Sequence, residues 1–232
     1  MISLKNSERL KCILSLIKDE EIIADIGTDH GLLPLMLLEK NSIKKIYATD
    51  ISSKSLEKLF EKIGDQNTDR LEIRVTDGLK GLENPYPDLA VIAGMGSRLI
   101  IKILDSSSNI LKNIKTFIFQ PNTKVDELRV YLHENGFSIE EEKTIVEEGR
   151  YYNIIRAIHG IEKYDKESFY KYGKILLENK DLATREYLES ELRRYYSLES
   201  KIDNIDIKAE GRSREIRNEI EIIKEALNYY EA

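Results

Sequence analysis

The sequence contains little of what disulfide-bonded, zinc-binding or membrane proteins need. Among its 232 residues, Cys12 is the one cysteine, which excludes an intramolecular disulfide and a zinc site built on several cysteines. The longest apolar runs, such as residues 32–38, are far shorter than the roughly 20 residues that span a bilayer. No basic segment followed by an apolar one stands at the start. We therefore expect a cytoplasmic protein that uses neither a membrane nor a metal.

Basic charge is not in excess either. Lys and Arg total 36 against 42 Asp and Glu, which gives a formal net charge of −6. This balance argues against a protein that coats nucleic acid, although it allows a basic face on part of the surface. Hydrophobic residues make up 41% and charged residues 34% of the chain, so part of it has little interior to fill. One large domain with an attachment fits this length and composition.

Residues 1–160 alternate short β-type runs with helical stretches. The expected strands are rich in Ile, Val, Tyr or Phe and are bounded by Asp, Gly or Pro: 21–26, 45–50, 71–76, 88–93 and 115–120. Helices are expected between them at 32–40, 52–63, 97–104 and 124–135. This alternation predicts a parallel sheet covered on both faces. Two further runs, 137–146 and 151–158, predict an antiparallel pair that closes one edge of a mostly parallel seven-stranded sheet. This α/β order is typical of Rossmann-like class I methyltransferases.

Residues 161–232 have a different character. They contain no proline, two glycines, and 14 Lys or Arg against 17 Asp or Glu, so most of the segment should be helical. Apolar residues recur at coiled-coil spacing along two stretches: Leu188, Leu192, Tyr195 and Ile202, then Ile216, Ile220, Ile223, Leu227 and Tyr230. With a turn at 203–211 they predict a coiled-coil-like helical hairpin, whose first helix would span about 50 Å at about 1.5 Å per residue. We therefore expect two domains, 1–160 and 161–232.

The first expected strand runs into Asp25, Gly27, Asp29 and His30. A glycine turn between a parallel strand and a helix lets the backbone approach a nucleotide-like ligand closely. Asp25 and Asp29 put negative charge where a pyrophosphate would sit, which disfavours NAD and favours a cationic ligand such as S-adenosylmethionine. The alternative is that Asp29 only caps the following helix.

The next two strand ends are also acidic. Asp50 lies 25 residues after Asp25, where an acidic side chain can accept hydrogen bonds from both ribose hydroxyls. Asp77 can accept a hydrogen bond from the exocyclic amine of an adenine, and Gly78 leaves room for the adenine ring. Asp-Gly by itself is also an ordinary turn. Together the three acidic strand ends predict an adenosine pocket along the carboxyl edge of the sheet.

The fourth and fifth strands end in segments that fit the substrate side of such a pocket. Gly94 and Met95 can place backbone carbonyls beside a methyl donor. Gln120 and Asn122 carry amides that can hydrogen-bond a base edge. A tight helix start and a β-turn are the respective alternatives.

Several of these motifs resemble those of the bacterial tRNA methyltransferases that modify N1 of adenine 22, the TrmK family. The motifs are Arg9-Leu10, Ala24 to His30 with Leu33-Pro34, Asp77-Gly78-Leu79, Ile92 to Gly96, and Gln120-Pro121-Asn122. The resemblance covers essentially the whole chain, because that family also ends in a helical appendage. Ser97 stands where the family commonly continues with a second glycine.

The resemblance implies methyl transfer from S-adenosyl-L-methionine to N1 of adenine 22 in tRNA. It implies these donor contacts: Arg9, Asp25, Gly27, Asp29, His30, Asp50, Asp77, Gly78, Gly94 and Met95. The catalytic candidates are Asp29, Gly94, Gln120 and Asn122. For Arg9 the alternative is a surface arginine, and for His30 a histidine satisfied by the backbone.

The resemblance also favours phosphate contact by one face of the C-terminal helices over a merely solvated face. We expect a monomer, with a dimer through the helical arm as the alternative. Two rival functions stay open at this point. One is a methyltransferase for another RNA or a small molecule, and the other is a non-catalytic adenosylmethionine-binding interaction protein.

Overall fold

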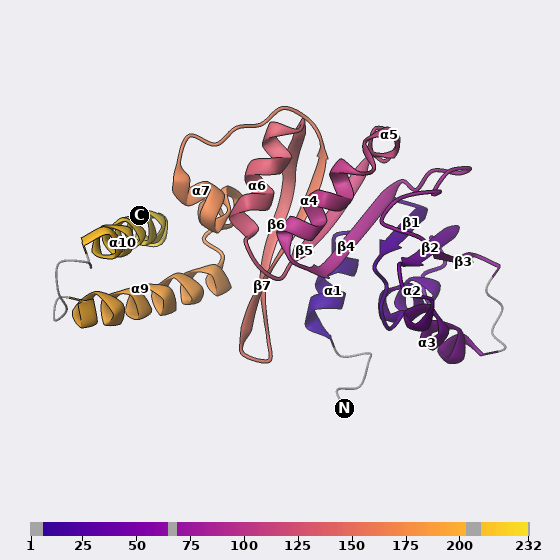
Figure 1. Ribbon diagram of the computed structural model, residues 1–232, viewed down its shortest axis with the longest axis horizontal. Coiled ribbons are helices and arrows are strands. Elements are labelled where there is room, and N and C mark those ends of the chain that lie inside the picture. The colour runs from indigo at the N-terminus through magenta and orange to yellow at the C-terminus, as the bar shows by residue number, and fades with distance from the viewer. Residues whose placement is uncertain (1–6, 65–68, 203–209, 232) are drawn as a thin grey trace. The chain divides into compact units, whose positions relative to one another are not determined.

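The computed structural model describes residues 7–64, 69–202 and 210–231 (Figure 1). These residues form two compact units. The first contains the described residues up to Glu141 together with Ile145–Glu162. The second contains Glu142–Thr144 and the described residues from Lys163 onward.

The first unit is built on a seven-stranded sheet in the order β3-β2-β1-β4-β5-β7-β6. The strands are β1 (Ile22–Ile26), β2 (Lys45–Asp50), β3 (Leu71–Val75), β4 (Leu89–Met95), β5 (Thr116–Pro121), β6 (Phe137–Glu147) and β7 (Arg150–His159). The five strands from β3 to β5 are parallel, and β7 pairs antiparallel with β5. This arrangement confirms the predicted Rossmann-like α/β fold, with strand ends that differ from the prediction by one or two residues.

Helices cover both faces of this sheet. They are α1 (Glu8–Ser15), α2 (Leu32–Leu38), α3 (Ser53–Ile63), α4 (Ser97–Asp105), α5 (Ser108–Leu111) and α6 (Val125–Glu134). On one face, α1 and α2 share an apolar cluster with the strands, in which Ile13 and Leu37 join Ile23. Figure 1 shows α4 and α6 together over β4 and β5. Strands buried on both faces consist of nearly continuous apolar residues, which is why these runs were recognisable in the sequence.

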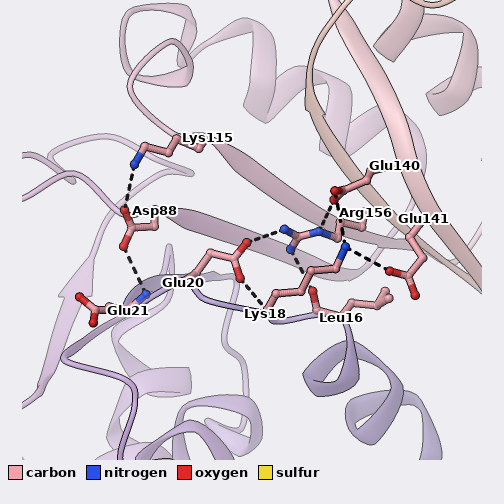
Figure 2. Close-up of polar contacts among 9 residues, drawn as sticks. All are labelled: Leu16, Lys18, Glu20, Glu21, Asp88, Lys115, Glu140, Glu141 and Arg156. Atoms are coloured by element: carbon pink, nitrogen blue, oxygen red, sulfur yellow. Dashed lines mark hydrogen bonds and ion pairs between the residues drawn. The ribbon is translucent and has the colours of Figure 1, made fainter.

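An ion network lies near the amino ends of β1, β4 and β5 (Figure 2). Arg156 on β7 is buried, and its Nε and Nη2 donate to Glu140 at 2.5 Å and to Glu20 at 2.6 Å. Its Nη1 donates to the carbonyl of Leu16 at 2.9 Å. The hydrogen bond from Arg156 holds the pKa of Glu140 below its usual value. The network therefore joins the segment between α1 and β1 to the β6–β7 hairpin.

The second unit consists of the described C-terminal helices α7 (Glu167–Tyr172), α8 (Lys174–Glu178), α9 (Leu182–Ile202) and α10 (Glu210–Glu231). Helices α9 and α10 pack against each other. The predicted seam residues Leu188, Ile216, Ile220 and Ile223 are buried, and Leu192, Tyr195, Leu227 and Tyr230 are half-buried. Ile222 and Ala226 are buried as well, so α10 buries a wider strip than a coiled-coil seam.

The length predicted for the first helix of this hairpin was wrong. Helix α9 has 21 residues and is therefore about 31 Å long, not about 50 Å. The prediction overlooked a helix start, because Asp181 Oδ1 accepts the backbone N–H of Thr184 at 2.8 Å and so caps α9. Of the turn predicted at 203–211, residues 210 and 211 belong to α10 and the rest lies outside the described residues.

Candidate functional site

A cavity of about 500 Å³ lies at the carboxyl ends of the central parallel strands, where open α/β sheets bind ligands. Its lining comes from α1, the end of β1 and the turn after it, the start of α2, the end of β4, the segment after β5, and β7: Arg9, Leu10, Asp25, Gly27, Thr28, Asp29, His30, Leu32, Leu33, Ala93, Gly94, Met95, Asn122 and Tyr152. Eight of the predicted site residues are in this lining. The other four are Asp50, Asp77, Gly78 and Gln120.

Asp25 is the buried carboxylate of the cavity, with 5% of its surface exposed. Burial, which a hydrogen bond from Thr28 Oγ1 opposes and the nearby Asp50 supports, raises its pKa to about 7. A carboxyl group with such a pKa titrates near neutral pH and gains its charge most readily beside a cation. Asp25 therefore suits a positively charged ligand.

The turn after β1 brings its backbone close to the cavity. Gly27 has a φ of +74°, and a Cβ there would overlap Met95 Cε. The N–H groups of Gly27 and Thr28 both donate to the carbonyl of Thr49, at 2.8 and 2.9 Å. The positive φ favours glycine at this position, and a Cβ would in addition displace the end of the Met95 side chain.

Asp29 and His30 follow in the same turn and are exposed. The carboxylate Oδ2 of Asp29 lies 3.3 Å from His30 Nε2. The N-cap position of α2 is taken by Gly31, and no side chain caps this helix. The alternative reading of Asp29 as a helix cap is therefore wrong, and its carboxylate remains available to the cavity.

Asp50 lies next to the cavity rather than in its lining. It ends β2, is half-buried, and accepts the backbone N–H groups of Ser52 at 2.8 Å and of Asp29 at 3.2 Å. These bonds orient the carboxylate at the strand end. Asp50 thereby also holds the turn that carries Asp29.

Asp77 and Gly78 follow β3, also outside the lining of the cavity. Asp77 is exposed, and its hydrogen bond with Lys80 at 2.9 Å lowers its pKa. Gly78 has a φ of +65°, and a Cβ there would lie 2.9 Å from Ile103 Cγ2. Gly78 therefore lets the turn pack closely against α4, at a strand end on the carboxyl edge of the sheet.

Gln120 and Asn122 hold the peptide of Gly94. Gln120 is fully buried, and its Oε1 accepts the N–H of Gly94 at 3.1 Å and an N–H of Arg9 at 2.5 Å. Its Nε2 donates to Asn122 Oδ1 at 3.0 Å and to the carbonyl of Pro121 at 3.1 Å. Asn122 Nδ2 donates to the carbonyl of Gly94 at 2.7 Å. The backbone N–H and the carbonyl of Gly94 are thus both fixed by side chains, beside a shift in the β4–β5 register.

Arg9 reaches this network from α1. Its Nε lies 3.7 Å from a carboxylate oxygen of Glu147, and its guanidinium carbon lies 5.5 Å from the ring centre of Tyr152. The other Glu147 oxygen accepts from Ser7 Oγ at 2.8 Å and from the Arg9 backbone N–H at 3.3 Å. Four contacts therefore place Arg9 at the wall of the cavity, which is unlike a surface arginine.

The sequence did not single out Thr28, Glu147 or Tyr152. Thr28 lies inside the recognised motif, and its contact three residues back to Asp25 is the only one that a local pattern could have suggested. The serine at position 97 also has a structural role, since its buried Oγ donates to the carbonyl of Thr123 at 2.9 Å.

The described residues hold neither a cluster of metal ligands nor a membrane-spanning helix. Within residues 7–64, 69–202 and 210–231, no group of three or more His, Cys, Asp or Glu side chains could hold a metal ion. No helix in the part of the chain that the structure describes is long and apolar enough to cross a membrane.

Known proteins share this fold and sequence pattern. The family model described as a methyltransferase domain matches residues 6–155. The tRNA (adenine(22)-N(1))-methyltransferase of Bacillus subtilis is 25% identical, covering 99% of this chain and 100% of that protein.

Solved structures give the same result. The B. subtilis m1A22 tRNA methyltransferase TrmK superposes with a TM-score of 0.83 at 25% identity, covering 97% of this chain and 100% of that one. The M. capricolum TrmK complex with S-adenosyl-homocysteine has a TM-score of 0.83 at 28% identity, covering 96% and 98%. The chain belongs to the methyltransferase domain family, and within it to the TrmK tRNA (adenine-N1)-methyltransferases.

Proposed function

We propose that this protein transfers a methyl group from S-adenosyl-L-methionine to N1 of adenine 22 in tRNA. The observation that carries the proposal is the cavity at the carboxyl edge, whose lining includes both the buried, titratable Asp25 and the cationic Arg9. Charge of both signs in one pocket suits a donor with an amino acid end. The nucleotide position comes from the full-length relative named for adenine 22.

The residues present fit this donor. Asp25 pairs with its ammonium group and Arg9 with its carboxylate, since both line the cavity. Gly27 lets the donor come close to the backbone of the turn, and His30 and Met95 line the same cavity. Asp50 accepts from the ribose hydroxyls, whereas Asp77 and Gly78 take the adenine end, because they stand at successive strand ends. When bound, the donor supplies an electrophilic methyl group on a positively charged sulfur.

The protein's main tasks are to position the adenine and to exclude water. Adenine N1 carries a free lone pair near neutral pH, so no general base has to remove a proton before methyl transfer. Positive charge then develops on the base, and a nearby anion or carbonyl stabilises it. Asp29 and the carbonyl of Gly94 are the groups in the cavity that serve this purpose.

The two amide residues divide the work of holding the base. All hydrogen-bonding groups of Gln120 are engaged within the protein, so it acts as a positioning residue for Gly94 and Arg9. Asn122 is exposed and keeps one amide hydrogen beyond its bond to Gly94. That hydrogen is the donor we assign to the base edge.

The C-terminal helices supply contacts to the body of the tRNA in this proposal. Taking an adenine out of its stack costs a few kcal/mol, which binding elsewhere on the RNA offsets. The seam residues of α9 and α10 are buried within one chain, which supports a monomer rather than a dimer through the arm. The proposed tRNA substrate supports a cytoplasmic location as part of the proposal.

The test is to incubate the protein with unmodified tRNA and labelled donor, and then to locate the modified nucleotide. Label at N1 of adenine 22 is the expected result. Label on a different nucleotide, or on small molecules only, would support the rival substrates, and no transfer would leave an adenosylmethionine-binding interaction protein.

The role of Asp29 has its own variant. Asp29→Ala is expected to bind the donor but to lose turnover by at least a hundredfold, because it lacks the anion that stabilises the charged adenine. Donor binding is measured by calorimetry and turnover by label incorporation. Normal turnover in a variant that binds the donor would contradict the role.

A further inference from the structure

Helix α3 carries a row of lysines on one face. Lys54, Lys58 and Lys62 are spaced four residues apart, so they follow one another along the helix with a rise of about 6 Å per step. All of them are exposed, whereas Leu56, Leu59 and Ile63 form the buried face of the helix. We call these three residues the lysine row.

The lysine row lies at the turn that lines the cavity. Lys62 Nζ donates to the carbonyl of His30 at 2.6 Å, and Lys58 Nζ is 3.4 Å from His30 Nδ1. The helix is packed tightly there, because a Cβ on Gly31 would lie 2.5 Å from Leu59 Cδ1. Since His30 belongs to the cavity lining, Lys58 and Lys62 lie beside the cavity, and Lys54 continues the row along α3.

In the described part of the chain, the lysines of the row form no ion pair with a carboxylate, although α3 also carries Glu57 and Glu61. The arginine at the start of α4 differs, because Arg98 donates twice to Glu127, at 3.1 and 3.2 Å. Three lysines without an anionic partner beside a ligand cavity attract anions, above all a chain of evenly spaced ones.

We propose that the lysine row binds the phosphodiester backbone of the tRNA strand that presents its adenine to the cavity. The inference rests on the proposed function, because that strand must pass the opening of the cavity. Lysine side chains are long enough to adapt to successive phosphates of one strand, and such contacts fix the position of a nucleic acid without reading its sequence. The row therefore sets where the strand lies, whereas the cavity selects the base.

The first test uses the full-length protein and unmodified tRNA, with the dissociation constant measured from about 50 to about 200 mM salt. Lys54→Gln is the most informative single variant, because Lys54 has no bond to the His30 turn. Log affinity falls as log salt rises, and the variant is expected to make this fall less steep by about 0.7, the value for one contact to a single strand. Lys112→Gln, another exposed lysine but one that follows α5, is the control and should leave the slope unchanged.

The triple variant Lys54→Gln/Lys58→Gln/Lys62→Gln extends the test. It is expected to make the fall of log affinity with log salt less steep by about 2 and to weaken tRNA binding more than tenfold at low salt. Donor affinity is measured in parallel to show that the cavity persists. Wild-type slope and affinity in Lys54→Gln and in the triple variant would overturn the inference. A separate assay of tRNA methylation by the wild-type protein tests the proposed function. A failure of the lysine-row proposal can therefore be distinguished from a failure of the proposed function.

Discussion

Asp25 is the residue whose protonation the fold changes most clearly within the cavity. Burial raises its pKa to about 7, compared with about 4 in an unfolded chain. The folded protein therefore holds this proton more tightly than the unfolded protein does. The stability that results is complete below about pH 4 and is lost as the pH rises through about 7. A bound cation offsets this loss because it pairs with the carboxylate.

We predict that donor affinity rises with pH through the titration of Asp25. Between pH 6 and pH 7.5 the ionised fraction of a group with a pKa of about 7 increases roughly eightfold, and affinity should increase by a similar factor. Isothermal titration calorimetry with S-adenosylmethionine measures this change. In Asp25→Asn the affinity should be lower and should lose this pH dependence.

Asp77→Asn is the control for this titration. Asp77 is exposed and its hydrogen bond with Lys80 lowers its pKa, so it stays ionised from pH 6 to pH 7.5. Replacing it therefore leaves the pH dependence in place, whatever it does to the affinity itself. A wild-type affinity that does not change over this range would contradict the pairing of Asp25 with the donor.

Sequence reasoning found residues whose signal is local and missed those whose signal is not. Asp25, Gly27 and Asp29 lie in one turn, where the change from strand to helix and the need for glycine are both visible in a few residues. Glu147 lies 138 positions after Arg9 in the sequence, so no spacing rule could have paired them. The contact depends on the order of the strands, which places β6 and β7 at the far edge of the sheet and α1 beside them.

At the level of elements, the Arg156 network holds the β6–β7 hairpin to the chain between α1 and β1. The Arg156 side chain is 6% exposed and that of Glu20 is 10% exposed. Burial raises the pKa of Glu20, but the hydrogen bond and charge of Arg156, together with backbone N–H donors such as that of Lys18, outweigh burial, so the net shift is downward. The two groups are therefore charged at neutral pH, and each depends on the other for compensation.

We predict that Arg156→Met lowers the free energy of unfolding by about 3 kcal/mol at neutral pH. It leaves Glu20 charged and largely buried, and it leaves the Leu16 carbonyl without its donor. Urea unfolding followed by circular dichroism measures the change. The deficit should shrink as the pH falls below about 4.5, where the glutamates become protonated.

Lys115→Met is the matched control for this network. Lys115 also appears in Figure 2, but it is 83% exposed and lies 3.9 Å from Asp88. Exposed pairs of this kind contribute about 0–1 kcal/mol. If Arg156→Met cost no more than Lys115→Met, the network would not be what holds the hairpin.

The strands were easier to predict than the C-terminal helices for a physical reason. A parallel strand buried on both faces needs consecutive apolar residues, and polar turns mark its ends. Helix α9 is exposed on most of its surface, so its boundary depends on one capping bond from Asp181 instead of on a change in hydrophobicity. The shift in the β4–β5 register between Ala93 and Met95 was also invisible, because it concerns the pairing of two strands that are far apart in the sequence.

For the whole molecule, a net charge of −6 does not decide whether the chain binds RNA. The charges are segregated: Asp25 and Asp29 line the cavity, whereas exposed cations lie on α3 and on the helices of the second unit. In the second unit, Arg193, Arg212 and Arg214 are exposed and form no ion pair within the described residues. Arg194 is different, because it donates twice to Glu191. Composition averages over such differences, and only placement reveals which cations remain available.

The final prediction concerns this second unit, which a chain ending at Glu162 would lack. The shortened protein should bind S-adenosylmethionine within about threefold of the full chain, because every residue lining the cavity lies before that point. Its affinity for tRNA should fall by at least about a hundredfold, since several phosphate contacts disappear.

The residual binding of the shortened chain should still weaken with salt, because the lysine row on α3 remains. A full-length variant, Arg193→Gln/Arg212→Gln/Arg214→Gln, removes three of the exposed cations of the second unit without removing the helices, and Arg194→Gln, whose cation is already paired, is its control. The triple variant is expected to reduce the salt slope by about 2, and the control by much less. If the shortened chain and the triple variant both bound tRNA as the full chain does, the tRNA contacts would have to lie on the first unit alone.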